Sequence, residues 1–118
     1  MKCAHIVTDA NGGTSISEID IPFINTIPGK PLIASRMYSA TGGLFVRGEP
    51  CFQDWHPAPR RQLVCVLSGE LEIEASDGQT RKLRAGGTML VEDTSGRGHI
   101  TRISEETVVI YVVVPDGL

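Results

Sequence analysis

The chain has 118 residues and a mass of 12.7 kDa, which is the size of one ordinary domain. Its content of 41% hydrophobic and 21% charged residues excludes an intrinsically disordered chain and a membrane protein. Its 11 Lys and Arg residues against 14 Asp and Glu residues give a net charge of −3. No long run of one charge sign is present, so nucleic acid is not an expected partner. We expect a single domain over residues 1–118.

Neither end of the sequence has the pattern of a membrane or export signal. The longest apolar run, Val108 to Val114, is far shorter than the roughly 20 residues that span a bilayer. The first residues, MKCAHIVTDANGG, lack the apolar stretch of a secretory signal. Cys3, Cys51 and Cys65 are odd in number and irregularly spaced, which favours reduced thiols. The sequence therefore predicts a cytoplasmic protein without a membrane partner.

The N-terminal third contains short candidate strands. Ile19, Ile21 and Phe23 occupy alternate positions before a proline-containing stretch, although Ser15–Ile21 could form a helix instead. Two further candidate strands, Leu32–Ser39 and Leu44–Val46, lie on either side of a glycine-containing turn.

The middle of the chain has the clearest hairpin pattern. Acidic and apolar residues alternate strictly over Glu70–Ala75, which predicts a strand with one wet face and one buried face. Ser76–Gln79 has turn chemistry, and Thr80–Leu83 can return antiparallel. On either side of this hairpin, Gln62–Leu67 and Thr88–Val91 are predicted core strands.

The last predicted strand, Thr107–Val114, is rich in β-branched residues at both alternating sets of positions. This pattern is typical of a strand that is covered on both faces. Short strands follow one another with glycine-bearing turns and without internal repeats. The sequence therefore indicates an all-β sandwich or barrel.

Two histidines are the candidate chemical groups. His56 opens the segment His56–Gln62, in which alternate residues share a face if the chain is extended, although its two prolines make this parity approximate. His99 follows the glycine-containing turn Thr94–Gly98, which could bring its imidazole into the same cavity. His5 is expected to be structural.

The segment from Trp55 to Arg102 resembles the two conserved motifs of the cupin superfamily. Cupins are small antiparallel jelly-roll barrels, also described as double-stranded β-helices. Their first motif ends in a glutamate, six residues and a glycine, and Gln62 precedes Gly69 at that spacing. In this register His56 matches the first histidine of the family's His-x-His pair, and Ala58 stands where the second would be.

The second cupin motif is also represented. His99 matches its histidine, and Gly86 or Gly87 matches its opening glycine. The segment Glu92–Gly98 replaces the usual Pro-x-Gly element. The resemblance covers about half of the chain and is to small, single-domain RmlC-like cupins with a degenerate metal motif.

The resemblance raises the question of a metal cofactor. Catalytic cupins commonly bind iron, manganese, nickel or zinc through three histidines and a glutamate. At those positions this chain has two imidazoles, the neutral amide of Gln62 and the side chain of Ala58, which cannot ligate. His56, Gln62 and His99 are therefore candidate ligands of at most a weakly held divalent zinc, nickel, manganese or iron ion. We expect a metal-free cavity.

Three further side chains are candidate substrate-binding groups, together with Gln62. Arg60 shares strand parity with His56 and could clamp a carboxylate or phosphate. Trp55 and Tyr38 could form walls of the pocket, although a packing or dimer contact is an alternative role for Trp55.

The acidic pair Glu92 and Asp93 has two alternative roles. Both residues are expected to pair with Arg97 or Arg102 and so order the turn. The alternative is that a carboxylate lies beside His99 and orients its ring, as a general base requires.

These residues and the resemblance together imply a small-molecule-binding cupin in which His56 and His99 are catalytic. The first hypothesis is an isomerase, lyase or cyclase that moves a proton on a small carbonyl or sugar-like substrate, which Arg60 would bind if it is acidic, as metal-free sugar epimerases do. The second is a non-catalytic module that binds or senses a small ligand, which the ligand positions missing at Ala58 and Gln62 favour. A homodimer is expected from the family and from the apolar N-terminal third.

Overall fold

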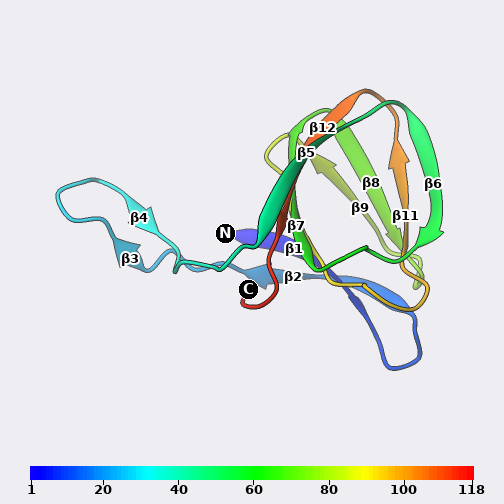
Figure 1. Cartoon of the computed structure of the whole chain (residues 1–118), viewed down its shortest axis with the longest axis horizontal. Helices are drawn as coiled ribbons and strands as arrows, with labels where there is room; N and C mark the ends of the chain where they lie inside the picture. Colours follow the sequence, from blue (N-terminus) through cyan, green and yellow to red (C-terminus); the bar gives the residue numbers. More distant parts are fainter.

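The computed structural model describes residues 1–118 and contains twelve β-strands and no α-helix. The strands form a six-stranded sheet, a four-stranded sheet and a short two-stranded hairpin. Figure 1 shows the two larger sheets facing each other as a barrel, with the hairpin held away from it on an arm. No helix is present that is long and apolar enough to cross a membrane. The predicted all-β fold is confirmed.

The six-stranded sheet has the order β2-β1-β10-β7-β12-β5. Its strands are β1 (Lys2–Thr8), β2 (Thr14–Asp20), β5 (Gly42–Gly48), β7 (Gln62–Ser68), β10 (Thr88–Val91) and β12 (Thr107–Val113). All neighbours in it are antiparallel except β1 and β10, which are parallel. This pair departs from the expected antiparallel barrel because no tight turn joins β1 to β10 and sets their relative direction.

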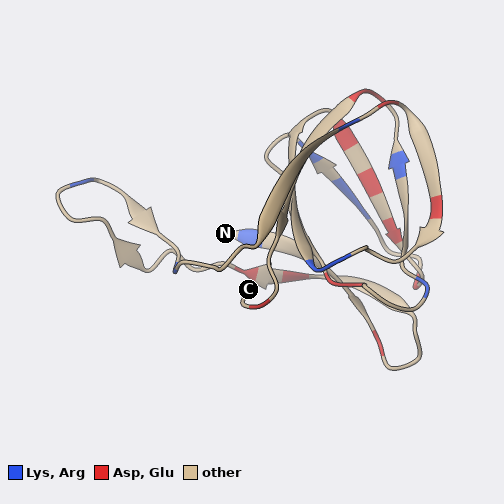
Figure 2. Cartoon of the chain, in the orientation of Figure 1, with Lys and Arg blue, Asp and Glu red and all other residues tan.

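The four-stranded sheet has the order β6-β11-β8-β9, and all its neighbours are antiparallel. Its strands are β6 (Cys51–His56), β8 (Glu70–Ala75), β9 (Thr80–Arg84) and β11 (His99–Ile103). Along β8 the apolar residues are buried and the glutamates are half-buried, so the predicted alternation is confirmed. Figure 2 shows these acids on β8 beside basic residues on β9.

The core lies between the two sheets. β7 contributes Val64 and Val66, β8 contributes Leu71 and Ile73, and β10 contributes Met89. Alternate residues of each strand point into this layer because successive side chains of a strand leave opposite faces. The two sheets therefore enclose one main apolar interior.

A strand, β2, forms in the N-terminal part of the chain, and the alternative helix over Ser15–Ile21 does not, because β2 pairs with β1 along its whole length. Of Leu32–Ser39 only β4 (Ile33–Ala34) is a strand, and it pairs with β3 (Asn25–Thr26) at the end of the arm. Prolines near these residues remove backbone donors and keep the pairing short. Thr107 and Val109 on the inner face of β12 are buried, whereas Val108, Ile110 and Val112 on its outer face are half-buried, so the cover expected on both faces is only partial on the outer one.

Candidate functional site

A cavity of about 70 Å³ lies between the sheets, where β6 ends and β7 and β11 begin. Six of its apolar lining residues are Val64, Leu71, Ile73, Leu83, Met89 and Val91. Its polar lining residues are Gln53, His56, Gln62, His99, Thr101 and Tyr111. No Lys, Arg, Asp or Glu residue lines it. Gln53 and Pro59 line the cavity and are also exposed, so the cavity reaches solvent at this end.

The structure brings His56 and His99 together in this cavity. His56 is the last residue of β6, His99 is the first residue of β11, and the two are direct cross-strand partners. Their ring centroids lie 4.6 Å apart, with 57° between the ring planes. Directly opposed residues of neighbouring strands share a face of the sheet, so the register itself places both imidazoles on the inner side.

A buried carboxylate orients His99. The Nδ1 of His99 donates a hydrogen bond to Oδ2 of Asp93 over 2.5 Å. Asp93 is 0% exposed and His99 is 6% exposed, so this bond is shielded from water. Because Nδ1 carries the proton of this bond, the neutral ring has its lone pair on Nε2. The carboxylate also compensates the positive charge that the ring carries after it accepts a proton.

His56 has the same tautomer for a different reason. Its Nδ1 donates to the backbone carbonyl oxygen of Asp54 over 2.7 Å. A carbonyl oxygen can accept a hydrogen bond but cannot donate one, so the ring nitrogen that faces it must carry the proton. Both histidines therefore keep Nε2 as the nitrogen that is free to accept or transfer a proton.

The two positions that depart from the cupin motif, Gln62 and Ala58, also border the cavity. Gln62 begins β7, and its Oε1 is buried without a hydrogen-bond partner. Ala58 is buried, and its backbone N–H donates to the carbonyl of Asp93 over 2.9 Å. This bond connects the segment before β7 to the loop that carries Asp93, whose carboxylate binds His99.

The donor set in the cavity does not fit the metal centre that the fold family implies. Two imidazoles are its only strong metal ligands, Gln62 offers a neutral amide oxygen, and Ala58 offers no donor. The structure contains no group of three or more His, Cys, Asp and Glu side chains able to hold a metal ion. Divalent cations prefer a larger set that includes anionic ligands. The groups available for chemistry in the cavity are therefore its own side chains.

Arg60, Trp55 and Tyr38 do not line the cavity. Arg60 is exposed, because residues 57–61 do not form a strand and the parity counted back from Gln62 does not apply to them. Trp55 is half-buried, with the guanidinium of Arg97 lying 4.7 Å from its ring centroid. Tyr38 lies against an apolar groove at the base of the arm.

The expected pairing of Glu92 and Asp93 with Arg97 or Arg102 is wrong. Arg102 bonds Glu72 and Glu74 of β8 instead. Asp93 takes its alternative role beside His99, because the loop after β10 turns its side chain inward.

Glu92 joins three distant parts of the chain. It accepts hydrogen bonds from Nε of Arg61 and, over 2.9 Å, from Nε2 of His5, which has the structural role expected of it. Arg61 also donates to the carbonyls of Val114 and Gly117 near the C-terminus. Burial alone would raise the pKa of Glu92, but the bonds from Arg61 and His5 outweigh it and hold this pKa below its usual value.

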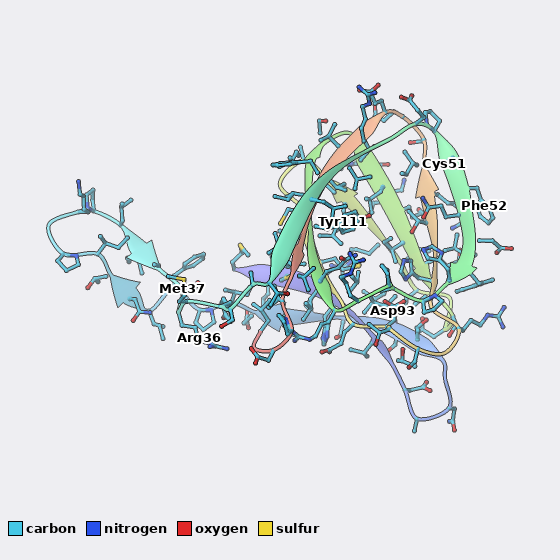
Figure 3. The ribbon with its side chains drawn as sticks, in the orientation of Figure 1. Arg36, Met37, Cys51, Phe52, Asp93 and Tyr111 are labelled. Carbon is cyan, nitrogen blue, oxygen red and sulfur yellow. The ribbon has the colours of Figure 1, made fainter.

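Sequence reasoning missed three polar residues of the cavity: Gln53, Thr101 and Tyr111. Thr101 could have been found from parity, since it stands two positions after His99 on one strand. Burial raises the pKa of Tyr111, so its hydroxyl keeps its proton and can donate. Figure 3 shows Tyr111 and Asp93 in the barrel, and Arg36 and Met37 where the arm leaves it.

No protein-family model and no curated protein matches this sequence. Among solved structures, the protein NMB1881 from Neisseria meningitidis is similar with a TM-score of 0.50 and 14% identity, over 65% of this chain and 82% of that one. A putative ethanolamine utilization protein, EutQ, from Salmonella typhimurium is similar with a TM-score of 0.54 and 18% identity, over 99% of this chain and 98% of that one. Together with the two facing sheets, these similarities show a cupin fold.

Proposed function

We propose that this cupin binds a small molecule between its two sheets and moves a proton on it with His99 and His56, as RmlC-like cupins do without a metal. One observation carries the proposal. The Nδ1 of His99 is bonded to a fully buried carboxylate, which leaves Nε2 as a proton acceptor 4.6 Å (ring to ring) from a second imidazole. A base held by a carboxylate beside a second acid–base group is the arrangement that general acid–base catalysis needs.

In the proposed reaction, Nε2 of His99 takes the proton from a carbon next to a carbonyl. The electron pair of that C–H bond moves toward the carbonyl oxygen and forms an enolate, and Asp93 compensates the charge on His99. The hydroxyls of Thr101 and Tyr111 line the cavity and can donate to the enolate oxygen. A protonated imidazole of the pair then returns a proton to carbon, so an isomerisation has no net change in protons.

The lining restricts the substrate. Ligand pockets for drug-sized molecules measure roughly 300–1,000 Å³, whereas this cavity measures about 70 Å³. It therefore takes a few non-hydrogen atoms, or one end of a larger compound. The sequence predicted that Arg60 would bind an acidic substrate, but no Arg or Lys residue lines the cavity. An uncharged carbonyl compound therefore fits the cavity better than an acidic one.

The test is proton exchange in heavy water. The protein is incubated with a panel of small uncharged aldehydes and ketones, and proton NMR follows the loss of the signal next to the carbonyl. We expect exchange above the buffer rate for at least one compound, and loss of that exchange in His99→Ala and His56→Ala. Arg60→Ala, whose side chain is exposed, is the control that keeps the activity. Exchange that survives in both histidine variants would refute the proposal.

A non-catalytic binding module is the second candidate. Eight of the 14 lining residues are hydrophobic, and Gln62 Oε1 is buried and ready to accept a hydrogen bond from a ligand. If compounds of the panel shift the NMR signals of cavity residues but no proton is exchanged, the protein is a binder rather than an enzyme.

We also propose a cytoplasmic location for the protein. The three cysteines are all free thiols, as in proteins of reducing compartments.

A further inference from the structure

One hydrogen-bond acceptor of the cavity has no partner in the protein. Gln62 lines the cavity and is 4% exposed, and its Oε1 is buried without a hydrogen bond. Its direct cross-strand partners are Val91 of β10 and Val113 of β12, and neither side chain carries a donor. The guanidinium of the adjacent Arg61 bonds Glu92 and backbone carbonyls near the C-terminus. A donor for Oε1 therefore has to come from a molecule that occupies the cavity.

An unpaired acceptor of this kind discriminates between ligands. A complex that leaves a buried polar group unpaired is weaker by roughly tenfold to a hundredfold than one that pairs it. A ligand that donates a hydrogen bond to Gln62 removes this cost, whereas an apolar ligand of the same shape does not. Sites built to bond a hydroxyl or N–H group accordingly reject analogues that lack it.

The lining restricts the donor to an uncharged group. No Asp or Glu residue lines the cavity to compensate an ammonium group, and no Lys or Arg residue lines it to compensate a carboxylate. Burying either charge without a partner is costly, so amines and acids are excluded. An amide N–H is neutral, but an amide makes the neighbouring C–H group far less acidic than an aldehyde or ketone does. The donor that remains is a hydroxyl group.

This hydroxyl lies next to the carbonyl that reacts. The cavity measures only about 70 Å³, so both groups of the ligand must be within a few atoms of each other. Tyr111 stands two residues before Val113, the partner of Gln62, and so is a diagonal neighbour of Gln62 on the inner face. Tyr111 can donate to the carbonyl oxygen while Gln62 accepts from the hydroxyl. A carbonyl and a hydroxyl on neighbouring carbons satisfy both residues within the smallest molecule.

We propose that the cavity selects short, uncharged α-hydroxy aldehydes or ketones, and that Gln62 is the residue that recognises their hydroxyl group. This inference rests on the proposed function and narrows its substrate class. Gln62 stands where the cupin motif has a glutamate, and the amide keeps an acceptor there without burying a negative charge. Gln62 contacts the ligand and takes no part in moving the proton.

The experiment compares two ligands that differ only in the hydroxyl group. Hydroxyacetone and butanone have the same number of non-hydrogen atoms, and the hydroxyl of one stands where the other has a methyl group. Each is titrated to millimolar concentrations into the ¹⁵N-labelled wild type, and the NMR shifts of cavity residues give its Kd. We expect hydroxyacetone to bind roughly tenfold more tightly than butanone, or better.

Gln62→Met removes the acceptor at nearly unchanged side-chain length. The ratio of the two Kd values should then fall to about one, because neither ligand finds a partner at this position. Gln79→Met is the matched control, since it makes the same substitution at an exposed position between β8 and β9, and it should keep the wild-type ratio. If Gln62→Met does not fold, the ratio measured on the wild type still decides whether the hydroxyl is selected.

The outcomes separate this inference from the proposed function. Equal affinities of the wild type, a preference for butanone, or binding of neither compound would overturn the inference, and so would a ratio that Gln62→Met leaves unchanged. Proton exchange in heavy water is followed on the same two compounds. Exchange with equal affinities refutes the selection of the hydroxyl and leaves the proposed function standing. A clear preference for hydroxyacetone without exchange refutes the catalysis and supports the recognition by Gln62.

Discussion

The carboxylate of Asp93 determines which nitrogen of His99 meets a ligand. Its Oδ2 accepts the hydrogen bond from the protonated Nδ1 of His99, while its Oδ1 is buried without a hydrogen-bond partner. An unpaired buried polar atom costs stability and is retained mainly where it serves a site. The residue therefore has a positioning role that a nonpolar substitute cannot supply.

Removing the carboxylate of Asp93 should allow His99 to adopt either neutral tautomer. In Asp93→Ala the Nδ1–H loses its buried acceptor, so the proton is no longer confined to that nitrogen. In ¹⁵N NMR spectra of the imidazoles, we expect the wild type to show a protonated Nδ1 on His99 and the variant to show two averaged nitrogens. His56, which is held by a backbone carbonyl, is the internal control. A His99 signal that stays unchanged would show that Asp93 does not position the ring.

The missing metal ligands can be restored. Ala58→His with Gln62→Glu adds an imidazole and an anionic carboxylate at two positions that already line the cavity. The double variant should bind Zn²⁺ or Ni²⁺ at least a hundredfold more tightly than the wild type in calorimetric titration, because ligand number and negative charge both increase. Equal affinity of the two proteins would mean that these positions do not face the histidine pair.

At the scale of elements, the site depends on two irregular segments rather than on the strands. The segment between β6 and β7 and the loop between β10 and β11 are joined by the bond from Ala58 to Asp93. Gly98 has a φ of +74°, and a Cβ there would overlap the carbonyl of His56. The close approach of this loop to β6 therefore requires glycine.

Gly98→Ala should destabilise the protein more than a comparable change elsewhere. The added methyl group meets backbone as well as an unfavourable φ, so we expect a loss of at least about 2 kcal/mol in the free energy of unfolding. Gly78→Ala is the control, because Gly78 has a φ of +92° but open space around it, and it should lose about 1 kcal/mol. Urea denaturation measures both values. Equal losses would show that the packing of Gly98 against His56 contributes nothing.

The contacts of Glu92 give the fold an acid-sensitive link between β1, the segment before β7 and the C-terminal residues. Because the pKa of Glu92 in the folded protein lies below its ordinary value of 4.5, the link contributes fully above pH 4.5 and is lost as the pH falls through the lower folded value. Glu92→Gln should lower the free energy of unfolding by about 1 kcal/mol at pH 7, a modest amount because the side chain is 35% exposed.

This difference between Glu92→Gln and the wild type should shrink as the pH is lowered from 5 to 3. Urea unfolding of both proteins across this range provides the measurement. A difference that stays constant would mean that the ion pairs of Glu92 do not stabilise the fold.

At the scale of the whole molecule, the sequence predicts the barrel well and its periphery poorly. β7, β8, β9, β10 and β12 follow from alternation or apolar runs, because one face of each is buried between the sheets. The arm could not be predicted, since apolar residues there suggest burial that a single chain does not provide. Arg60 was misplaced because strand parity was extended into a segment that is not a strand.

The candidate site was predictable only where motif spacing applied. His56, Gln62 and His99 come together as the cupin register implies, but Gln53 and Tyr111 are contributed by strand pairings that no local pattern shows. The role of Asp93 depends on how the loop after β10 turns. The sequence does not decide whether Asp93 pairs with an arginine or orients His99.

Thermal stability should depend on concentration if the protein is a dimer. Mass action stabilises an associated state as the concentration rises. We expect the Tm of the wild type to increase by several degrees over a hundredfold range of concentration. Calorimetry at matched scan rates provides the comparison. A wild-type Tm that is independent of concentration would contradict the association.

The edge strands of the two sheets differ in the side chains that they carry. β9 carries Arg81, Lys82 and Arg84, and β2 carries Glu18 and Asp20, whereas β5 exposes Leu44 and Phe45. Charged side chains on an edge strand disfavour pairing with a further strand, so edge-to-edge association is blocked at β2 and β9. The remaining edge strands, β5 and β6, expose Phe45 and Phe52, so further strands are expected to add at these two edges rather than at β2 or β9.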